Sequence, residues 1–172
     1  MVFPVRNNIV LIGMPGAGKS TNGLLLAKAL GKDFLDTDIL IQVREGKTLQ
    51  QVMDSSDYLQ LRAIEEAVLM GIDTQNSVVA TGGSAVYSAA GMGQLGKNGL
   101  IVYLDVSLKT LEERIQDYET RGIAKHPGQS FGDLFAERSE LYKRYADVTI
   151  KCDQLAPEDV VLKVIEACRA NL

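Results

Sequence analysis

A glycine-rich run near the start of the chain has the residue types and the spacing that bind nucleotide phosphates. Residues 13–21 (GMPGAGKST) match the pattern G-x-x-x-x-G-K-[ST] in full. Glycines let the backbone approach an anion without a Cβ in the way, and successive N–H groups together with a helix start add positive charge. The run predicts an ATP site formed by Gly13, Gly16, Ala17, Gly18, Lys19, Ser20 and Thr21.

Side chains within and after this run are suited to phosphoryl transfer. Lys19 can reach the β- and γ-phosphates, and the Ser20 hydroxyl can ligate Mg²⁺. Asp36 can hold Mg²⁺ through water, because this cation prefers oxygen ligands. Asp38 can accept or orient the proton of an acceptor hydroxyl. The alternative is that these aspartates only cap a helix.

Several later residues are candidates for holding a second ligand. Arg62 shares a helical pattern with Glu65 and Glu66, and the run Ala80–Ser84 (ATGGS) follows a strand pattern. The other candidates are the arginines Arg114, Arg121 and Arg138. Each has a plainer interpretation, namely a surface ion pair for Arg62, an ordinary turn for the glycine run and solvated charges for the other arginines.

Short apolar runs alternate with helical patterns along the chain. Strands are expected at Asn8–Ile12, Asp33–Leu35, Ser77–Ala80, Leu100–Leu104 and Val148–Ile150. Helices are expected at Thr21–Leu30, Asp38–Arg44, Leu49–Met53, Tyr58–Met70, Leu108–Gln116, Asp133–Tyr145 and Pro157–Ala170. This alternation predicts a single α/β domain over residues 1–172, with a five-stranded parallel sheet between helices. Ligands of such sheets bind at the carboxyl ends of the strands, where these candidates lie.

The composition excludes several classes of function. The 172 residues carry a formal net charge of −4, which disfavours nucleic-acid binding. A single histidine, His126, leaves little material for a Ser-His-Asp hydrolase or a histidine metal site. The sequence contains no membrane-length apolar run and no signal-type segment, and its two cysteines fit a reducing compartment. We therefore expect a cytoplasmic protein that binds no membrane, and a monomer.

Taken together, these residues resemble the shikimate kinase family from about Asn8 to Ile150. The shared features are the phosphate-binding run, D-T-D at Asp36–Asp38, R-x-x-E at Arg62–Glu65, T-G-G at Thr81–Gly83, a lid arginine at Arg121 and E-R-x-x-L-Y at Glu137–Tyr142. The resemblance implies a P-loop NTPase fold of three layers, with a lid at about 118–130 and an acceptor-binding helical region at about 38–71. It also implies transfer of phosphate from ATP, with Mg²⁺, to shikimate, giving shikimate 3-phosphate.

The resemblance further implies a role for each candidate. Asp38, Arg62, Gly82, Gly83 and Arg138 would bind shikimate. Lys19 and Arg121 would contact the transferring phosphate and, with Asp38, would be catalytic. Arg114 would lie against adenine, and Ser20 and Asp36 would serve the metal. Two guanidiniums suit a carboxylate because each can donate two parallel hydrogen bonds.

The chain departs from the family pattern at four places. It has Ser84 where a third glycine is usual, Gly122-Ile123 in the lid in place of Pro-Leu, and Leu61 and Met53 where aromatic residues are common. These changes leave ATP use intact but alter the acceptor pocket. Two alternatives therefore stay open, a kinase of the same fold for another small hydroxy acid and an ATP-binding paralogue without catalysis.

Overall fold

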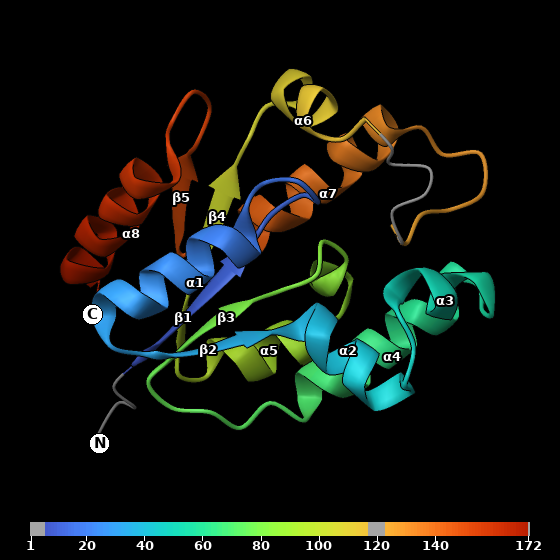
Figure 1. Ribbon diagram of the computed structural model, residues 1–172, viewed down its shortest axis with the longest axis horizontal. Helices are drawn as coiled ribbons and strands as arrows, with labels where there is room; N and C mark the ends of the chain where they lie inside the picture. Colours follow the sequence, from blue (N-terminus) through green and yellow to red (C-terminus); the bar gives the residue numbers. More distant parts are fainter. Residues whose placement is uncertain (1–5, 117–122, 172) are drawn as a thin grey trace.

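A parallel five-stranded sheet forms the centre of the protein (Figure 1). The computed structural model describes residues 6–116 and 123–171, and the account below concerns these. The strands lie in the order β2-β3-β1-β4-β5. Their bounds are β1 Asn8–Ile12, β2 Asp33–Asp36, β3 Ser77–Ala80, β4 Gly99–Asp105 and β5 Val148–Lys151. The predicted fold and all five predicted strands are confirmed.

The central strand β1 lies between two neighbouring strands and is buried on both faces of the sheet. It pairs in parallel with β3 (Ile9 opposite Val78) and with β4 (Val10 opposite Ile101). All five residues of β1 are buried, as expected where helices cover both faces of a sheet. Parallel pairing also brings the carboxyl ends of β1, β2 and β3 to one edge, where the candidate residues of the sequence follow.

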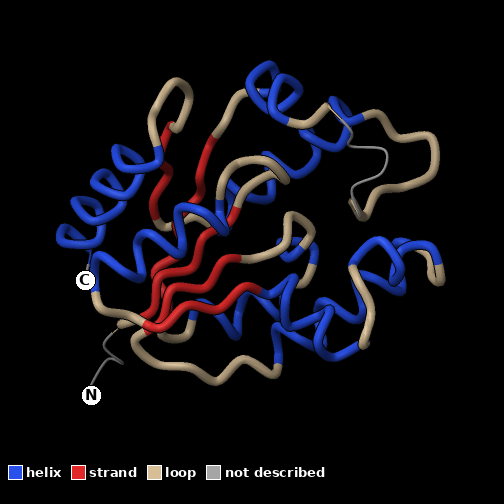
Figure 2. The backbone as a smooth tube through the Cα atoms, viewed as in Figure 1, coloured by secondary structure: helices blue, strands red, loops and turns tan. Residues whose placement is uncertain are grey.

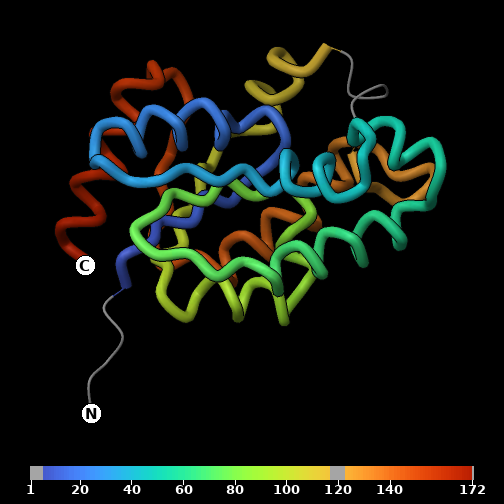
Figure 3. Tube along the Cα trace, turned by 60° about the horizontal axis from the view of Figure 1, so that its bottom comes forward, coloured from blue at the N-terminus to red at the C-terminus, as the bar shows by residue number. Residues whose placement is uncertain are grey.

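Helices cover the sheet on both sides (Figures 2 and 3). Helices α1 and α8 pack against one face, while α5 and α7 pack against the other, with α4 against α5. The bounds are α1 Lys19–Leu30, α2 Thr37–Glu45, α3 Leu49–Asp54, α4 Tyr58–Met70, α5 Ala89–Gly96, α6 Leu108–Arg114, α7 Phe131–Tyr145 and α8 Pro157–Asn171. In Figure 1, α2, α3 and α4 extend beyond the carboxyl edge of the sheet.

Local residue chemistry fixes where these helices begin and end. Helix α1 ends at Leu30 and is capped by Gly31, whose left-handed backbone (φ 63°) lets its N–H donate to the Ala27 carbonyl. Ser130 and Asp133 form a reciprocal capping box, so α7 begins at Phe131, two residues before the expected start. Helix α1 likewise begins at Lys19, two residues early, and α6 ends at Arg114, two residues before the expected end.

The sequence analysis missed two elements between β3 and β4. These are a 3-10 helix, η1, at Ala85–Tyr87 and the helix α5. Glycines lower helix propensity, and α5 contains three of them. A Cβ at Gly91 would lie 2.7 Å from the Leu69 side chain, so a glycine is needed where α5 approaches α4 closely. In the described part of the chain, no helix combines the length and the apolar character that a membrane crossing requires.

A matched pair of helical glycines tests how tightly α1 packs on the sheet. A Cβ at Gly23 would lie 2.8 Å from Phe34 and 3.3 Å from Leu11, whereas one at Gly93 would meet nothing within 4 Å. We predict that Gly23→Ala lowers the free energy of unfolding by about 1–3 kcal/mol through overpacking. Gly93→Ala should raise it by up to about 1 kcal/mol through helix propensity. Urea unfolding measures both, and equal effects would contradict the packing argument.

Candidate active site

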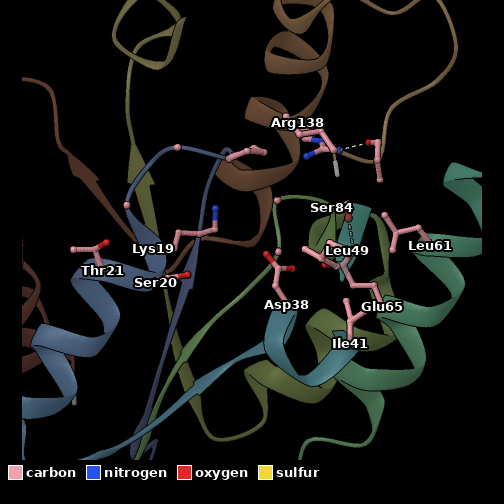
Figure 4. A pocket seen from close by; sticks show the side chains of 17 residues that line it. Lys19, Ser20, Thr21, Asp38, Ile41, Leu49, Leu61, Glu65, Ser84 and Arg138 are labelled. Atoms are coloured by element: carbon pink, nitrogen blue, oxygen red, sulfur yellow. Dashed lines mark hydrogen bonds between the residues drawn. The ribbon is translucent and has the colours of Figure 1, made fainter. Parts of the chain in front are cut away.

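One cavity of about 360 Å³ lies at the carboxyl edge of the sheet (Figure 4). Its lining comes from the glycine-rich run, from α2–α4, from the segment after β3, and from residues 123, 124 and 138. The lining residues are Pro15, Gly16, Gly18, Lys19, Ser20, Thr21, Asp38, Ile41, Leu49, Leu61, Glu65, Gly82, Gly83, Ser84, Ile123, Ala124 and Arg138. The predicted phosphate site and most of the predicted acceptor residues therefore share one cavity.

The glycine-rich run has the backbone that its sequence predicts. Gly16 and Gly18 have φ values of 84° and 89°, which L-residues rarely adopt. A Cβ at Gly13 would lie 2.8 Å from the Leu104 carbonyl oxygen, which also requires a glycine. Ala17 is buried, and Thr21 lines the cavity. The loop thus curls tightly between β1 and α1, with its N–H groups available to an anion.

The ammonium group of Lys19 folds back over this loop. Its Nζ donates to the carbonyl oxygens of Gly13 (2.7 Å) and Met14 (2.8 Å), and the side chain is buried. Burial lowers the pKa of Lys19 to about 8, and the nearby Arg138 adds to the lowering, whereas Asp38 and other carboxylates oppose it. A phosphate in the cavity would raise the pKa of Lys19 again, because its negative charge favours the ammonium form that desolvation disfavours.

Ser20, Asp36 and Asp38 lie together beside the loop. Ser20 Oγ donates to Asp36 Oδ2 at 2.5 Å, and Asp36 Oδ1 accepts from the Asp38 N–H at 3.0 Å. Asp36 therefore caps α2, as the alternative interpretation predicted. Its other carboxylate oxygen contacts Ser20 at the same time. Asp38 is half-buried and lines the cavity; desolvation raises its pKa, with a further contribution from Asp36, and Lys19 opposes it.

The residues present could supply only some of the ligands of a magnesium ion, and water and phosphate would supply the others. Within the described ranges, no group of three histidine, cysteine, aspartate or glutamate side chains could hold a metal. A hydroxyl and one carboxylate in contact, Ser20 with Asp36, match the way Mg²⁺ is held by few protein oxygens together with water and phosphate.

Glu65 is a site residue to which the sequence analysis gave no role beyond its place in the R-x-x-E pattern and a surface ion pair. It is 2% exposed, lines the cavity and accepts a hydrogen bond from the Ser84 hydroxyl. Desolvation raises its pKa to about 7, with Asp38 adding to the rise; Ser84, Arg138 and Lys19 oppose it. A Cβ at Gly82 would contact Glu65 Oε1 and lie 2.8 Å from Asp38 Oδ1, so this glycine lets two carboxylates share the cavity wall.

The two arginines expected to bind a carboxylate lie on facing helices. Arg138, on α7, is 1% exposed and donates to the Ala124 carbonyl, which excludes the solvated-charge interpretation. Arg62, on α4, is half-buried and forms no ion pair with Glu65 or Glu66; its Cζ lies 3.5 Å from the Tyr87 ring centroid. Unlike Arg138, it is not among the cavity-lining residues. Arg138 Cζ lies 5.5 Å from the same ring centroid.

Those remaining candidates that the structure describes lie near this cavity. Arg114 is exposed and its Nη1 donates to the Gly16 carbonyl at 3.2 Å, which places it against the outside of the phosphate loop. Arg121 and Gly122 lie outside the described residues, as do residues 118–120 of the expected lid. Leu61 lines the cavity as expected, whereas Met53 packs behind it in a small cluster with Val52 and Ala124.

The raised pKa of Glu65 predicts a pH dependence of stability. The folded carboxyl keeps its proton up to about pH 7, whereas the unfolded one loses it near its ordinary pKa of 4.5. The free energy of unfolding should therefore fall as pH rises between these values, by up to about 3 kcal/mol. Glu65→Gln should remove that fall. Urea unfolding at pH 5 and pH 8 measures it, with the exposed Glu66→Gln as control; an unchanged pH dependence in Glu65→Gln would refute the assignment.

Comparison with known proteins identifies the chain's relatives. A family model described as shikimate kinase matches residues 15–169. A shikimate kinase of Sulfurihydrogenibium sp. is 35% identical over 92% of this chain and 95% of its own. Another, of Thiobacillus denitrificans, is 37% identical over 84% of this chain and 81% of its own. The structure of shikimate kinase from Acinetobacter baumannii in complex with shikimate superposes with a TM-score of 0.87, at 31% identity over 98% of this chain and 96% of that one.

Proposed function

The chain belongs to the shikimate kinase family, and from that premise we propose that it transfers the γ-phosphoryl group of ATP to a hydroxyl of shikimate. The observation that carries the proposal is the shared cavity. Lys19 and the phosphate loop form one side of it, and Asp38, Glu65 and Arg138 form the other. A phosphate donor and a small hydroxy acid would thus meet in one cavity, where their reacting groups are held close together. The A. baumannii relative, which is bound to shikimate, supports this acceptor.

Different residues of the site bind the carboxylate and the hydroxyl groups of the acceptor. Arg138 and Arg62 bind the carboxylate, because planar guanidiniums donate paired hydrogen bonds to it. Asp38 and the backbone at Gly82 and Gly83 hold the ring hydroxyls. The side-chain-free surface of both glycines supports this assignment, since a Cβ at Gly83 would lie 2.8 Å from Arg138 Nη1.

The transfer itself is a displacement at phosphorus. The acceptor oxygen forms a bond to the γ-phosphorus while the bond to the β–γ bridging oxygen breaks, and ADP leaves. Asp38 orients the attacking hydroxyl and accepts its proton, and the product is shikimate 3-phosphate. Lys19 exchanges its loop carbonyl partners for phosphate oxygens, where its charge stabilises the transition state together with Arg121. Arg114 lies at the adenine end.

Magnesium belongs to this proposal through Ser20 and Asp36. When bound, Mg²⁺ offsets negative charge on the β- and γ-phosphates. Ser20 would hold the ion directly through its hydroxyl oxygen, and Asp36 would hold it through water. The 2.5 Å hydrogen bond between these side chains supports the pairing.

We also propose the cellular setting that the composition favours. The enzyme acts as a monomer in the cytoplasm on small molecules, without nucleic acid or membrane. Its net charge of −4 supports the absence of nucleic-acid binding.

A coupled ADP-release assay tests the acceptor. We expect turnover with shikimate that depends on ATP and Mg²⁺, and none above background with hydroxy acids of other ring shape or with uncharged polyols. Turnover of another acid but not of shikimate would favour a kinase of altered specificity. Nucleotide binding without turnover of any acceptor would favour a non-catalytic paralogue.

Asp38→Asn tests the mechanism. The amide keeps the size of the side chain but cannot accept the proton, so we expect kcat to fall by about 100-fold or more. The KM for ATP should change little. Asp33→Asn, the same substitution at an exposed position of β2, is the control and should leave kcat unaltered. An unaltered kcat in Asp38→Asn would remove Asp38 from any role in proton transfer or hydroxyl orientation.

A further inference from the structure

The segment Ser84–Ser88, which contains η1, carries three hydroxyl groups that all donate to carboxylates of the surrounding helices. The pairs are Ser84 with Glu65, Tyr87 with Glu137, and Ser88 with Glu66. Two of these glutamates lie on α4 and one on α7, the two helices that also carry Arg62 and Arg138. One short segment after β3 thus contacts a carboxylate beside each arginine.

These glutamates could compete with the acceptor's carboxylate for pairing with the two arginines. Glu65 and Glu66 follow Arg62 by three and four positions, the spacing at which helical residues form ion pairs. Glu137 is an exposed neighbour of Arg138 on α7 that also accepts from Gln129 Nε2 at 3.1 Å. Tyr87 lies beside both Glu137 and Arg138. Yet in the described part of the chain the ion pairs include neither arginine. The carboxylates are instead occupied by hydroxyl donors.

The Tyr87 ring also lies against both guanidiniums, and its hydroxyl, which donates to Glu137, lies close to Arg138 as well. Arg62 Cζ lies 3.5 Å from the ring centroid, and Tyr58 flanks the same guanidinium at 5.1 Å. Contact with an aromatic face engages the flat side of a guanidinium and leaves its N–H edge free. The Nε atoms of Arg62 and Arg138 are both buried without a hydrogen-bond partner, and buried polar atoms of this kind call for a ligand.

We propose that Tyr87 is a positioning residue for the acceptor: with Ser84 and Ser88 it keeps nearby glutamates from pairing with Arg62 and Arg138, so that both guanidiniums stay free for the acceptor's carboxylate. This rests on the proposed function. An acceptor facing preformed Arg–Glu pairs would have to break a buried charge pair before binding, whereas here each guanidinium has an Nε donor without a partner and, in the described part of the chain, no paired carboxylate. The raised pKa of Glu65 acts in the same direction, since a neutral acid competes poorly for a cation.

The test separates the hydroxyl from the ring of Tyr87. Tyr87→Phe keeps the ring over Arg62 but releases Glu137 to approach Arg138. We expect the KM for shikimate to rise on the order of tenfold, equivalent to about 1.4 kcal/mol, with kcat and the KM for ATP within about twofold. Tyr87→Leu removes the ring as well and should raise the KM further. Tyr103→Phe is the matched control, because it removes a tyrosine hydroxyl that donates to Asp105 (3.1 Å) and should leave both constants unchanged.

Rescue distinguishes competition by Glu137 from general damage. In the double variant Tyr87→Phe/Glu137→Gln the released side chain carries no charge, so the KM for shikimate should return to within about twofold of the wild type. A Tyr87→Phe KM no higher than that of Tyr103→Phe, or a raised KM that Glu137→Gln does not restore, would overturn the inference while the proposed function stands. A wild-type enzyme without activity on shikimate would overturn the proposed function, and the inference with it.

Discussion

Charge held out of water at the carboxyl edge of the sheet is the constraint on which the rest of the structure depends. Lys19, Asp38, Glu65 and Arg138 line one cavity, and no ion pair joins any two of them in the part of the chain described. Burial penalises each charge, which lowers the pKa of Lys19 and raises those of Asp38 and Glu65. Without a substrate, this arrangement lowers the free energy of unfolding. A bound substrate supplies opposite charges and makes the same arrangement favourable.

The fold keeps these charges apart by giving each its own support. Lys19 is held by carbonyls of the phosphate loop, and Glu65 by the hydroxyl of Ser84. Arg138 is fixed through the Ala124 carbonyl, and one turn later on α7 the Tyr142 hydroxyl donates to the Gly83 carbonyl at 2.6 Å. Tyr142 also stacks on Tyr103 of β4, with ring centroids 5.1 Å apart, which ties α7 to the sheet. Positioning of this kind is what phosphoryl transfer demands of a protein.

Features that depend on residues adjacent in the sequence could be predicted, whereas features that depend on the packing of distant residues could not. The phosphate loop is one unbroken run whose chemistry dictates its residues, and the strands are short apolar runs between turns. Glu65 escaped notice because its partner, Ser84, lies 19 positions away and its burial depends on how α4 meets η1. Helix α5 was missed because Gly91, which its packing against Leu69 requires, also weakens the local helical signal.

The stretch Gly82–Ser84 also bears on how such an enzyme could acquire a new preference. A side chain at position 82 would strike Glu65 and Asp38, and one at position 83 would strike Arg138 and Pro15, so a substitution at either position displaces charged groups of the site. Position 84 already accommodates a side chain, and that side chain faces the cavity. Within Gly82–Ser84, position 84 is thus the one where a substitution can alter the shape of the acceptor pocket without displacing Asp38 or Arg138.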